Sequence, residues 1–391
     1  MASGSPRVLV VADHLGYPGG VVHGVTTYFL EVLPALVRAG VDLTVCYLRE
    51  PHPAAESLRA QGIEPIFLSA ARVNPFVGLR VVAMARQTGA TVLHAMGIKA
   101  TLMARLATRM VPARTILHLH DLLEPGPVVG RLQRTFARPT DMAICVARAA
   151  VPIAVECYNV RPERVRVIHN GIRLELYHRV QMDARVRLRG ELGVDEQTRV
   201  LLLVGRMHPI KGHRTMLRML PGIVRRCPDA VLWLAGDGPE RPACEALVGD
   251  LGLQQRVRFL GQRRDVPELL AASDLVVVPS QLEGLPIAAI EAHAAGRPVV
   301  GFGVGGVGEV VQDGISGHVV GAADEAAFIA AAAALLMDDR GRAEFGTAAR
   351  RLAERFSLDE HVRQLIRCYQ DIAVTRDART ARIVNGSKEK T

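Results

Sequence analysis

The chain has 391 residues, of which 49% are hydrophobic and only 4% aromatic, and its formal net charge is +9. This length exceeds one typical domain, so we expect two domains, each with enough apolar residues for its own core. The positive charge favours anionic partners, but no lysine- and arginine-rich run with interleaved aromatic residues occurs, so nucleic acid is not expected as a partner.

The six cysteines form no Cys-x-x-Cys pair, and several lie in apolar runs, where a free cysteine behaves as a small hydrophobe. Neither a zinc site nor a disulfide is expected from this spacing. No apolar run reaches the roughly 18 residues of a membrane-spanning helix, and the short polar N-terminus does not read as a signal peptide. The sequence therefore predicts a cytoplasmic protein.

The first half of the chain alternates short apolar runs with helical stretches, which is typical of α/β layers. Arg7-Val-Leu-Val-Val-Ala12 reads as a buried parallel strand, followed by a glycine-rich loop and a helix from about Val25 to Arg38. Further strands are predicted at 41–47, 65–68, 91–94, 114–118, 141–145 and 164–168. This pattern predicts a doubly wound, Rossmann-like domain over residues 1–178.

A second alternating pattern begins at Arg199, after a charged segment, 174–197, that we expect to be a weakly structured hinge. Its strands are predicted at 199–204, 230–235, 257–260, 274–278 and 298–302, and an alanine-rich helix at 324–337. The fold class is thus α/β with two Rossmann-like doubly wound domains, the second over 179–356. A last helix is predicted over 357–374, with Ser357 and Glu360 at capping-box spacing, and a disordered tail over 375–391.

Two glutamates, Glu283 and Glu291, bracket seven residues after a predicted strand. Pro286 suits the first turn of a helix, and Gly296 followed by Pro298 ends one. Glu283 would then lie in the loop at the helix mouth, and Glu291 about a turn and a half inside the helix. Carboxylates can accept hydrogen bonds from sugar hydroxyls, while the free N–H groups of a helix start can bind phosphate.

A basic loop, Gly205-Arg-Met-His-Pro-Ile-Lys-Gly212, also lies between a predicted strand and a predicted helix. Arg206 presents a planar guanidinium and Lys211 a compact ammonium, a pair suited to a diphosphate. The glycines at both ends would let the backbone approach the anion. The alternative is a solvated basic loop without a ligand.

Both motifs resemble those of the retaining glycosyltransferases with two Rossmann-like domains, the GT-B architecture of glycosyltransferase family 4. The resemblance extends over about residues 7–369 and is most specific over 200–320. It implies that Arg206 and Lys211 hold the pyrophosphate of a nucleotide sugar. It further implies that Glu283 grips sugar hydroxyls and that Glu291 accepts from the ribose hydroxyls. Other donor-binding residues expected from it are Gly205, Gly261, Gln262, Gly284 and Leu285.

In the first half, Thr115-Ile-Leu-His-Leu-His-Asp121 ends a predicted strand with a polar cluster. His120-Asp121 matches the His-Asp position that faces the sugar in the family, and His118 would share the strand face of His120. The alternatives are a histidine satisfied at a strand end and, for Asp121, a helix cap. The catalytic candidates are therefore His120, Glu283, Arg206 and Lys211.

The glycine-rich loop after the first strand departs from the family pattern. Gly19-Gly20 lies four residues early, and His23-Gly24 takes the usual place. Gly24 is therefore the better candidate for the donor site, which puts the acceptor contacts of this loop in doubt. Two further glycine-rich segments, 236–240 and 303–309, are each interpreted as a structural turn or as a phosphate contact.

Residues 128–139 suggest a basic amphipathic helix. Its arginines are Arg131, Arg134 and Arg138, and the opposite face would carry Val129, Leu132 and Phe136. Such an element can rest on an anionic membrane surface, which would place the protein peripherally at the inner face. The alternative is a solvated outer face.

Taken together, the sequence predicts a retaining glycosyltransferase that moves a sugar from a nucleotide diphosphate sugar to an acceptor hydroxyl in glycan, glycolipid or metabolite biosynthesis. The sequence contains no Asp-x-Asp motif, so neither a metal nor another cofactor is expected. Saccharide, lipid-linked and small-molecule acceptors all stay open. Two alternatives stay open as well, a nucleotide-sugar epimerase of the same architecture and a non-catalytic nucleotide-sugar-binding subunit. A glycoside hydrolase is disfavoured because it would not need Arg206 and Lys211.

Overall fold

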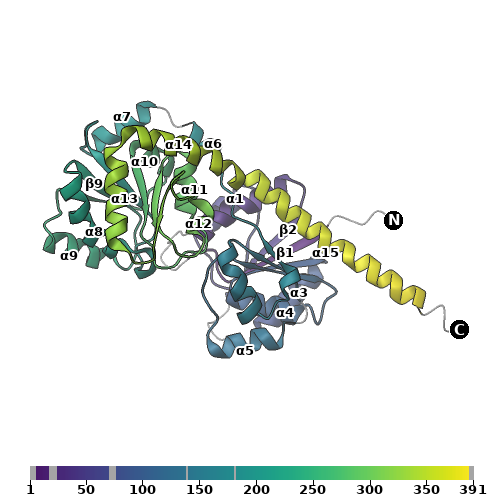
Figure 1. Ribbon diagram of the computed structural model, residues 1–391. Helices are drawn as coiled ribbons and strands as arrows, with labels where there is room; N and C mark the ends of the chain where they lie inside the picture. The colour runs from purple at the N-terminus through teal and green to yellow at the C-terminus, as the bar shows by residue number, and fades with distance from the viewer. Residues whose placement is uncertain (1–5, 17–23, 70–75, 138–139, 180–181, 387–391) are drawn as a thin grey trace. The chain divides into compact units, whose positions relative to one another are not determined.

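The computed structural model describes residues 6–16, 24–69, 76–137, 140–179 and 182–386. The chain divides into two compact units, the first formed by Met1–Gly171 with Leu358–Thr391 and the second by Ile172–Ser357 (Figure 1). This boundary lies earlier than the predicted 178/179. The reason is that the segment after Gly171 is already bonded within the second unit, where the Ile172 N–H donates to the Phe356 carbonyl at 2.9 Å.

A seven-stranded sheet forms the centre of the first unit, in the order β3-β2-β1-β4-β5-β6-β7 with every pair parallel. Its strands are the apolar runs seen in the sequence, as expected for a parallel sheet that is buried on both faces. Their bounds are β1 Arg7–Ala12, β2 Asp42–Tyr47, β3 Ile66–Phe67, β4 Val92–Met96, β5 Arg114–Leu119, β6 Thr140–Cys145 and β7 Val165–Val167.

Helices cover both faces of this sheet. Successive residues of β1 point to opposite faces, so Val8 and Val10 join one core while Leu9 and Val11 join the other. Helices α1 and α15 pack in the first core, and α3 and α4 in the second. The bounds are α1 Gly24–Arg38, α2 Ala55–Arg59, α3 Val77–Gln87, α4 Ile98–Ala107 and α5 Pro127–Thr135, with short turns η2 Arg148–Ala150, η3 Ile153–Cys157 and η4 Pro162–Arg164.

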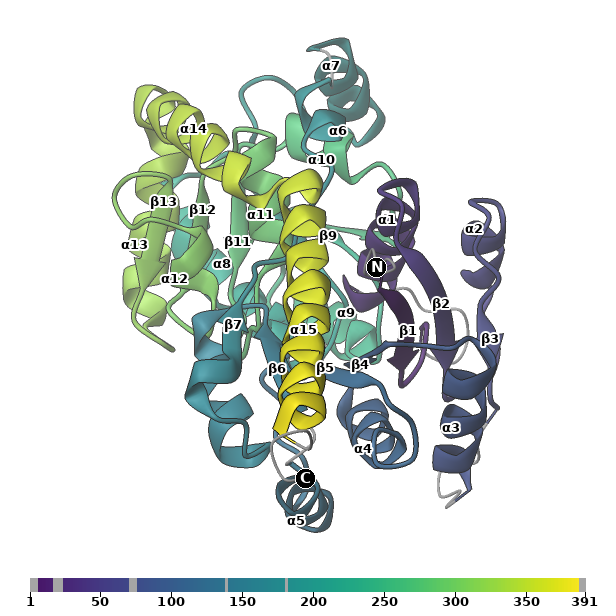
Figure 2. The same cartoon turned by 90° about the vertical axis from the view of Figure 1, so that its right-hand side faces the viewer.

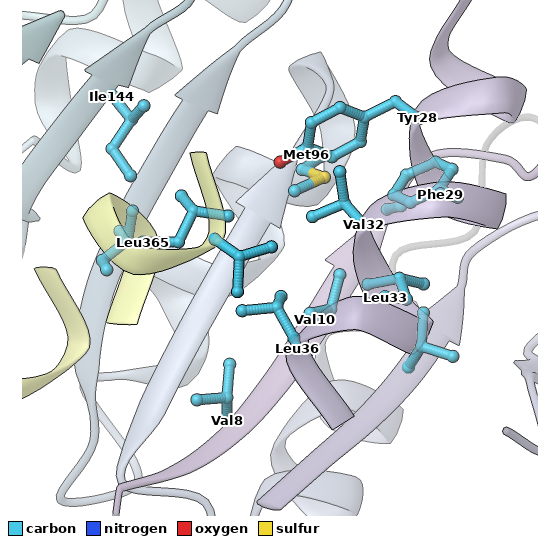
Figure 3. Packing of buried hydrophobic residues seen from close by; sticks show 14 of the residues in the cluster. Val8, Val10, Tyr28, Phe29, Val32, Leu33, Leu36, Met96, Ile144 and Leu365 are labelled. Atoms are coloured by element: carbon cyan, nitrogen blue, oxygen red, sulfur yellow. The ribbon is translucent and has the colours of Figure 1, made fainter. Parts of the chain in front are cut away.

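The C-terminal helix α15, Leu358–Gly386, completes the core of the first unit and lies across its sheet in Figure 2. Figure 3 shows Leu365 of this helix among the apolar side chains of the sheet and of α1. The helix continues to Gly386, whereas the sequence predicted a helix over 357–374 and then a disordered tail. Alanine and arginine, which are strong helix formers, recur over 376–382 and favour the longer helix.

The second unit is built on a six-stranded parallel sheet in the order β10-β9-β8-β11-β12-β13. The sequence missed β13, which is short and begins at Gly317. The bounds are β8 Arg199–Val204, β9 Ala230–Ala235, β10 Val257–Gly261, β11 Leu275–Val278, β12 Val299–Phe302 and β13 Gly317–Val320.

Helices α8 and α13 share one core of this unit, and α10 and α11 contact the central strands as well. The bounds are α8 His213–Arg226, α9 Arg241–Asp250, α10 Val266–Ala272, α11 Ile287–Ala294, α12 Val307–Val310, α13 Glu325–Met337 and α14 Asp339–Ala353, with turns η5 Pro209–Lys211 and η6 Glu354–Phe356.

The predicted weak structure of 174–197 is wrong, because this segment contains α6 Glu175–His178 and α7 Met182–Glu191. Two arginines fasten α7 to the sheet. Arg185 donates to Asp274 Oδ1 at 2.9 Å, and the buried Arg189 contacts Oδ2 of the same carboxylate at 3.4 Å. Burial would raise the pKa of Asp274, but the pKa is lowered because the carboxylate accepts from the Val200 N–H at 2.8 Å and lies beside both arginines. The charges that suggested a solvated hinge are therefore used in an internal ion-pair network.

Candidate functional site

The loops at the carboxyl ends of the second sheet are bonded to one another through their backbones. The Met207 N–H, after β8, donates to the Asp237 carbonyl, after β9, at 3.0 Å. The Gln281 N–H, after β11, donates to the Ile210 carbonyl at 2.8 Å. In a doubly wound unit this edge of the sheet is the usual place for a ligand. Both predicted donor motifs thus lie in one connected set of loops.

Gly212 makes one close approach between these loops possible. Its φ is 72°, a left-handed conformation that favours glycine. A Cβ at this position would overlap the carbonyl oxygen of Pro279, which precedes the second motif. The glycine at the end of the basic loop therefore allows the loops after β8 and β11 to meet.

Lys211 and Glu283 form an ion pair across these loops. Lys211 Nζ donates to Glu283 Oε1 at 2.7 Å, and the buried Ser280 hydroxyl donates to the same oxygen at 2.8 Å. Among the described residues, Lys211 and Ser280 both donate to Oε1 of Glu283, and neither of them donates to Oε2. Glu283 is buried, whereas Lys211 is half-buried. The pair places an ammonium directly beside a fixed carboxylate.

Arg206 lies in the turn immediately after β8 and is half-buried, on the same loop as Lys211. Two cationic side chains therefore follow one strand, with the N-terminus of α8 directly after them. Positive side chains and free N–H groups at a helix start together make an anion site.

Glu291 has different surroundings. It lies within α11, half-buried, and its Oε1 accepts a hydrogen bond from the Tyr177 hydroxyl at 2.8 Å. Burial raises the pKa of Glu291 to about 7, and the Tyr177 bond opposes that rise. A carboxyl with this pKa is partly protonated near neutral pH. Tyr177 was not predicted from the sequence, because it lies in the segment interpreted as a hinge.

The other donor residues predicted in the second unit lie in or beside the same loops. Gly261 ends β10, and its carbonyl accepts from the Gly236 N–H at 2.8 Å, while Gln262 is exposed. Gly284 and Leu285 lie between Glu283 and α11. The Gly306 N–H donates to the Gly284 carbonyl at 3.0 Å. This bond shows that segment 303–309 supports the helix mouth through one of its N–H groups.

In the first unit, His120 follows β5 and belongs to a cluster of aromatic side chains. Its ring centroid lies 4.0 Å from that of His118 and 4.4 Å from that of Tyr28. His118 Nδ1 is 3.1 Å from His94 Nε2, and His94 Nδ1 is 2.7 Å from the Tyr369 hydroxyl of α15. His118 and His120 thus do share a neighbourhood, as the strand alternation predicted.

The hydrogen bonds also fix one tautomer in this cluster. His361 Nδ1 is 2.8 Å from the His169 carbonyl and must donate to it, so Nε2 accepts from the Tyr28 hydroxyl at 3.0 Å. Burial lowers the pKa of His94 and of His120 to about 3 and that of His361 to about 4. At neutral pH these imidazoles are uncharged, so His120 can offer a neutral hydrogen bond but no positive charge.

The remaining predictions in the first unit have mixed outcomes. Gly24 is the first residue of α1, whereas Gly19, Gly20 and His23 lie outside the described residues. Asp121 accepts from the Leu123 N–H at 3.0 Å, which closes a turn ahead of α5 rather than capping a helix.

Helix α5 differs from the expected amphipathic pattern. Its inner face carries the buried Gln133, whose side-chain oxygen accepts from the buried Arg105 at 3.0 Å. Leu132, predicted for the face opposite the arginines, is 40% exposed and shares the outer surface with Arg131 and Arg134. A buried guanidinium needs oxygen partners, and this requirement sets the rotation of the helix. Arg138 lies outside the described residues.

In the described part of the chain, no group of three or more histidine, cysteine, aspartate or glutamate side chains is arranged to hold a metal ion. Over the same residues, no helix is both long and apolar enough to cross a membrane.

Comparisons with known proteins bear on both units. A family model described as "Glycosyl transferases group 1" matches residues 198–338, and one described as "Glycosyltransferase Family 4" matches residues 22–176. The Bacillus anthracis N-acetyl-alpha-D-glucosaminyl L-malate synthase is 30% identical over 313 residues, which are 78% of this chain and 80% of that enzyme. Together these matches cover the main parts of both units.

Two further similarities are informative. The D-inositol 3-phosphate glycosyltransferase of Corynebacterium kroppenstedtii is 34% identical over 55% of this chain, a match that spans 49% of that protein. The structure of Anabaena Alr3699/HepE in complex with UDP aligns with a TM-score of 0.82 at 23% identity, over 93% of this chain and 100% of that one. The predicted fold class, two parallel-sheet α/β domains of the GT-B type, is confirmed.

The glycine contact at the second sheet generates a stability prediction. Gly212→Ala should destabilise the protein by about 2 kcal/mol or more, because it combines a left-handed backbone with a clash against Pro279. Gly249→Ala is the matched control, since Gly249 lies exposed in α9 with no atom near the position that a Cβ would take. That control should be neutral or stabilising by up to about 1 kcal/mol. Thermal unfolding of both variants tests this, and equal melting temperatures would contradict the role given to Gly212.

Proposed function

The chain belongs to the group 1 and family 4 glycosyltransferases, and we propose that it transfers a glycosyl group from a nucleoside diphosphate sugar with retention and without a metal ion. One observation carries the proposal: the Lys211–Glu283 ion pair at the mouth of α11. A cation for a departing diphosphate and a carboxylate for the sugar are adjacent there. An epimerase and a non-catalytic subunit are the alternatives that the activity measurements below test.

The relatives support a donor and an acceptor class. UDP is present in the HepE structure, which supports a nucleoside diphosphate donor. L-malate and D-inositol 3-phosphate, which occur in the names of two relatives, are small anions with hydroxyl groups. A small anionic hydroxyl compound is therefore the first acceptor class to test, and its charge suits a chain of net charge +9.

The proposed reaction breaks the bond between the anomeric carbon and the leaving phosphate oxygen and forms one to the acceptor oxygen. The acceptor proton passes to the departing phosphate. In this proposal Arg206 and Lys211 bind the diphosphate and stabilise the negative charge that grows on the leaving group. The ammonium of Lys211 has three donors and can hold Glu283 and a phosphate oxygen together. This built-in positive charge is the basis for proposing that no metal is needed.

Glu283 and His120 have complementary parts in the proposal. The Oε2 oxygen of Glu283 is the one left for a sugar hydroxyl, since Lys211 and Ser280 bind Oε1. Its negative charge favours the positive character of the sugar during bond breaking. His120 supplies a neutral imidazole, whose contribution is a hydrogen bond. We propose acceptor attack on the face that the diphosphate leaves, within an ion pair, as the source of retention.

The diphosphate clamp predicts a selective loss of affinity. Arg206→Ala and Lys211→Ala should each weaken UDP binding by about 1–3 kcal/mol, because a charge-assisted hydrogen bond is lost. Uridine binding should change little. Arg218→Ala, an exposed arginine of α8, is the matched control. Calorimetry with both ligands tests this, and equal losses for UDP and uridine would contradict the clamp.

Substitutions of the two glutamates should affect different steady-state parameters. Glu283→Gln removes charge beside the reacting sugar and should lower kcat by roughly ten- to a thousandfold. His120→Ala should also chiefly lower kcat, whereas Glu291→Gln should chiefly raise KM, since ribose changes little during reaction. Rates should be equal with and without excess EDTA, and NMR should show an unchanged anomeric configuration in the product.

A reversed pattern, with Glu283→Gln affecting KM alone and Glu291→Gln kcat alone, would overturn these roles. Metal-dependent rates would overturn metal independence. Product in which the sugar is epimerised without transfer would favour the epimerase. Donor binding without any turnover, to an acceptor or to water, would favour the non-catalytic subunit.

We also propose a peripheral contact with the cytoplasmic membrane face through α5. Its outer surface combines Arg131 and Arg134 with the apolar Val128, which is 73% exposed, and with Leu132. Arginines attract anionic headgroups, while the apolar side chains can enter the interface.

This contact can be tested by sedimentation with phosphatidylglycerol vesicles. Reversing Arg131, Arg134 and Arg138 to glutamate should abolish binding, because the attraction becomes repulsion. A double reversal, Arg131→Glu with Arg134→Glu, is compared with Arg225→Glu and Arg226→Glu on the exposed end of α8, which changes net charge equally. Binding that survives the α5 reversals, or falls equally in the α8 control, would remove the membrane proposal.

A further inference from the structure

Tyr177 makes a specific long-range contact that the proposed reaction does not yet use. It lies in α6, directly after the chain enters the second unit, and its side chain is buried. Its hydroxyl donates to Glu291 Oε1 at 2.8 Å, across 114 positions of sequence. Helix α6 also packs against α10 and α11.

The hydroxyl, rather than the ring, is the informative part of Tyr177. A phenylalanine ring would fill the same apolar space, and a buried phenol needs a hydrogen-bond partner. Here the partner is the one carboxyl of α11, on the helix whose mouth carries Glu283. The contact therefore orients the carboxyl of a helix that begins next to the ligand loops, and it is not a surface ion pair.

We propose that Tyr177 is a positioning residue for Glu291, an inference that rests on the proposed use of a nucleotide sugar. By occupying Oε1, the phenol leaves Oε2 to accept from the ribose hydroxyls of the donor. The contact then makes the site selective for nucleotides with an intact ribose diol over deoxyribose analogues. The positioned atom is Oε2, and Tyr177 itself does not touch the ligand.

The ionisation of Glu291 supports this geometry. Burial raises the pKa of Glu291 and the Tyr177 bond lowers it, so the phenol keeps a larger share of the carboxyl ionised near neutral pH. An ionised carboxylate accepts stronger hydrogen bonds from hydroxyl groups than a neutral carboxyl does. Charged side chains on neighbouring elements include Arg350 of α14, which donates to the Ala295 carbonyl at 3.3 Å, Glu309 of α12 and Glu268 of α10. The shift in the pKa of Glu291 arises from burial and Tyr177 rather than from these groups.

The decisive experiment compares UDP with 2′,3′-dideoxy-UDP by calorimetry. Tyr177→Phe should weaken UDP binding about three- to tenfold, the scale of one hydrogen bond, and leave the dideoxy ligand within about twofold. In a Glu291→Gln background the same change should have little further effect, because the two residues act as a pair. In turnover, Tyr177→Phe should raise the donor KM and leave kcat near the parent value.

A matched control is available in the first unit. Tyr47 is also a buried tyrosine, and among the described residues its hydroxyl has no hydrogen-bond partner. Tyr47→Phe should therefore change neither ligand. Equal weakening of UDP and dideoxy-UDP by Tyr177→Phe would show a merely structural role and overturn the inference, as would the absence of any effect.

A ligand-free measurement separates this inference from the proposed function. The folded pKa of Glu291 lies above its unfolded value, so its contribution to stability is full at low pH and is lost as pH rises toward about 7. Without the Tyr177 bond the pKa of Glu291 rises further, so Tyr177→Phe should shift this loss of stability to higher pH. Glu291→Gln should abolish the pH dependence that Glu291 contributes. Unfolding of the three proteins between about pH 4 and pH 9 tests this. If the parent protein bound no UDP, GDP or ADP, the proposed donor class would be wrong. The shift of the pH–stability profile in Tyr177→Phe would still show whether the phenol acts on Glu291. An unchanged profile in Tyr177→Phe would refute it.

Discussion

The close backbone approach at Gly212 is the constraint on which the second unit's site depends. Without a side chain at this position, the loop after β8 can lie against the Pro279 carbonyl, at the start of the loop after β11. Lys211 precedes this contact and Glu283 follows it by four positions, so the ion pair between them is a direct result. A sheet edge thereby becomes a place where an anion and a sugar hydroxyl can be bound by side chains of fixed position.

The two glutamates of one motif receive opposite surroundings from the same fold. Glu283 has the Lys211 ammonium and the Ser280 hydroxyl on one of its oxygens. Glu291 accepts a hydrogen bond from the Tyr177 phenol, and burial raises its pKa to about 7. In the proposed reaction Glu283 would act on the reacting sugar and Glu291 on the ribose hydroxyls, and the fold gives these two carboxyls different partners. The spacing in sequence is shared, but the chemistry is set by residues from other elements.

Most strands, the two-domain plan and the position of the two motifs in loops after strands could be predicted from the sequence, because parallel strands are continuous apolar runs and glycine-bounded loops carry local signals. The short strand β13 gave too little signal. The helices α6 and α7 were missed because charged Arg185 and Arg189 suggested solvent, whereas they bind the distant Asp274. Tyr177 and the histidine cluster depend on contacts between residues far apart in the chain, for which one sequence carries no local pattern. The burial of Gln133 on α5 was not predicted for the same reason, since its partner Arg105 lies 28 positions away in the chain.

The position of α15 has a consequence for the order in which the protein is made. The second unit is one continuous segment, Ile172–Ser357, and all of its residues are synthesised before α15. The first unit begins earlier in the chain, yet one face of its sheet is only partly covered, by α1 and α2, until Leu365, Tyr369 and their neighbours have been translated. The domain that is synthesised first is therefore the last to close, and its apolar face must be kept from aggregating in the meantime. Removing α15 from the C-terminus would therefore destabilise the first unit, which contains the N-terminal residues, rather than the second unit.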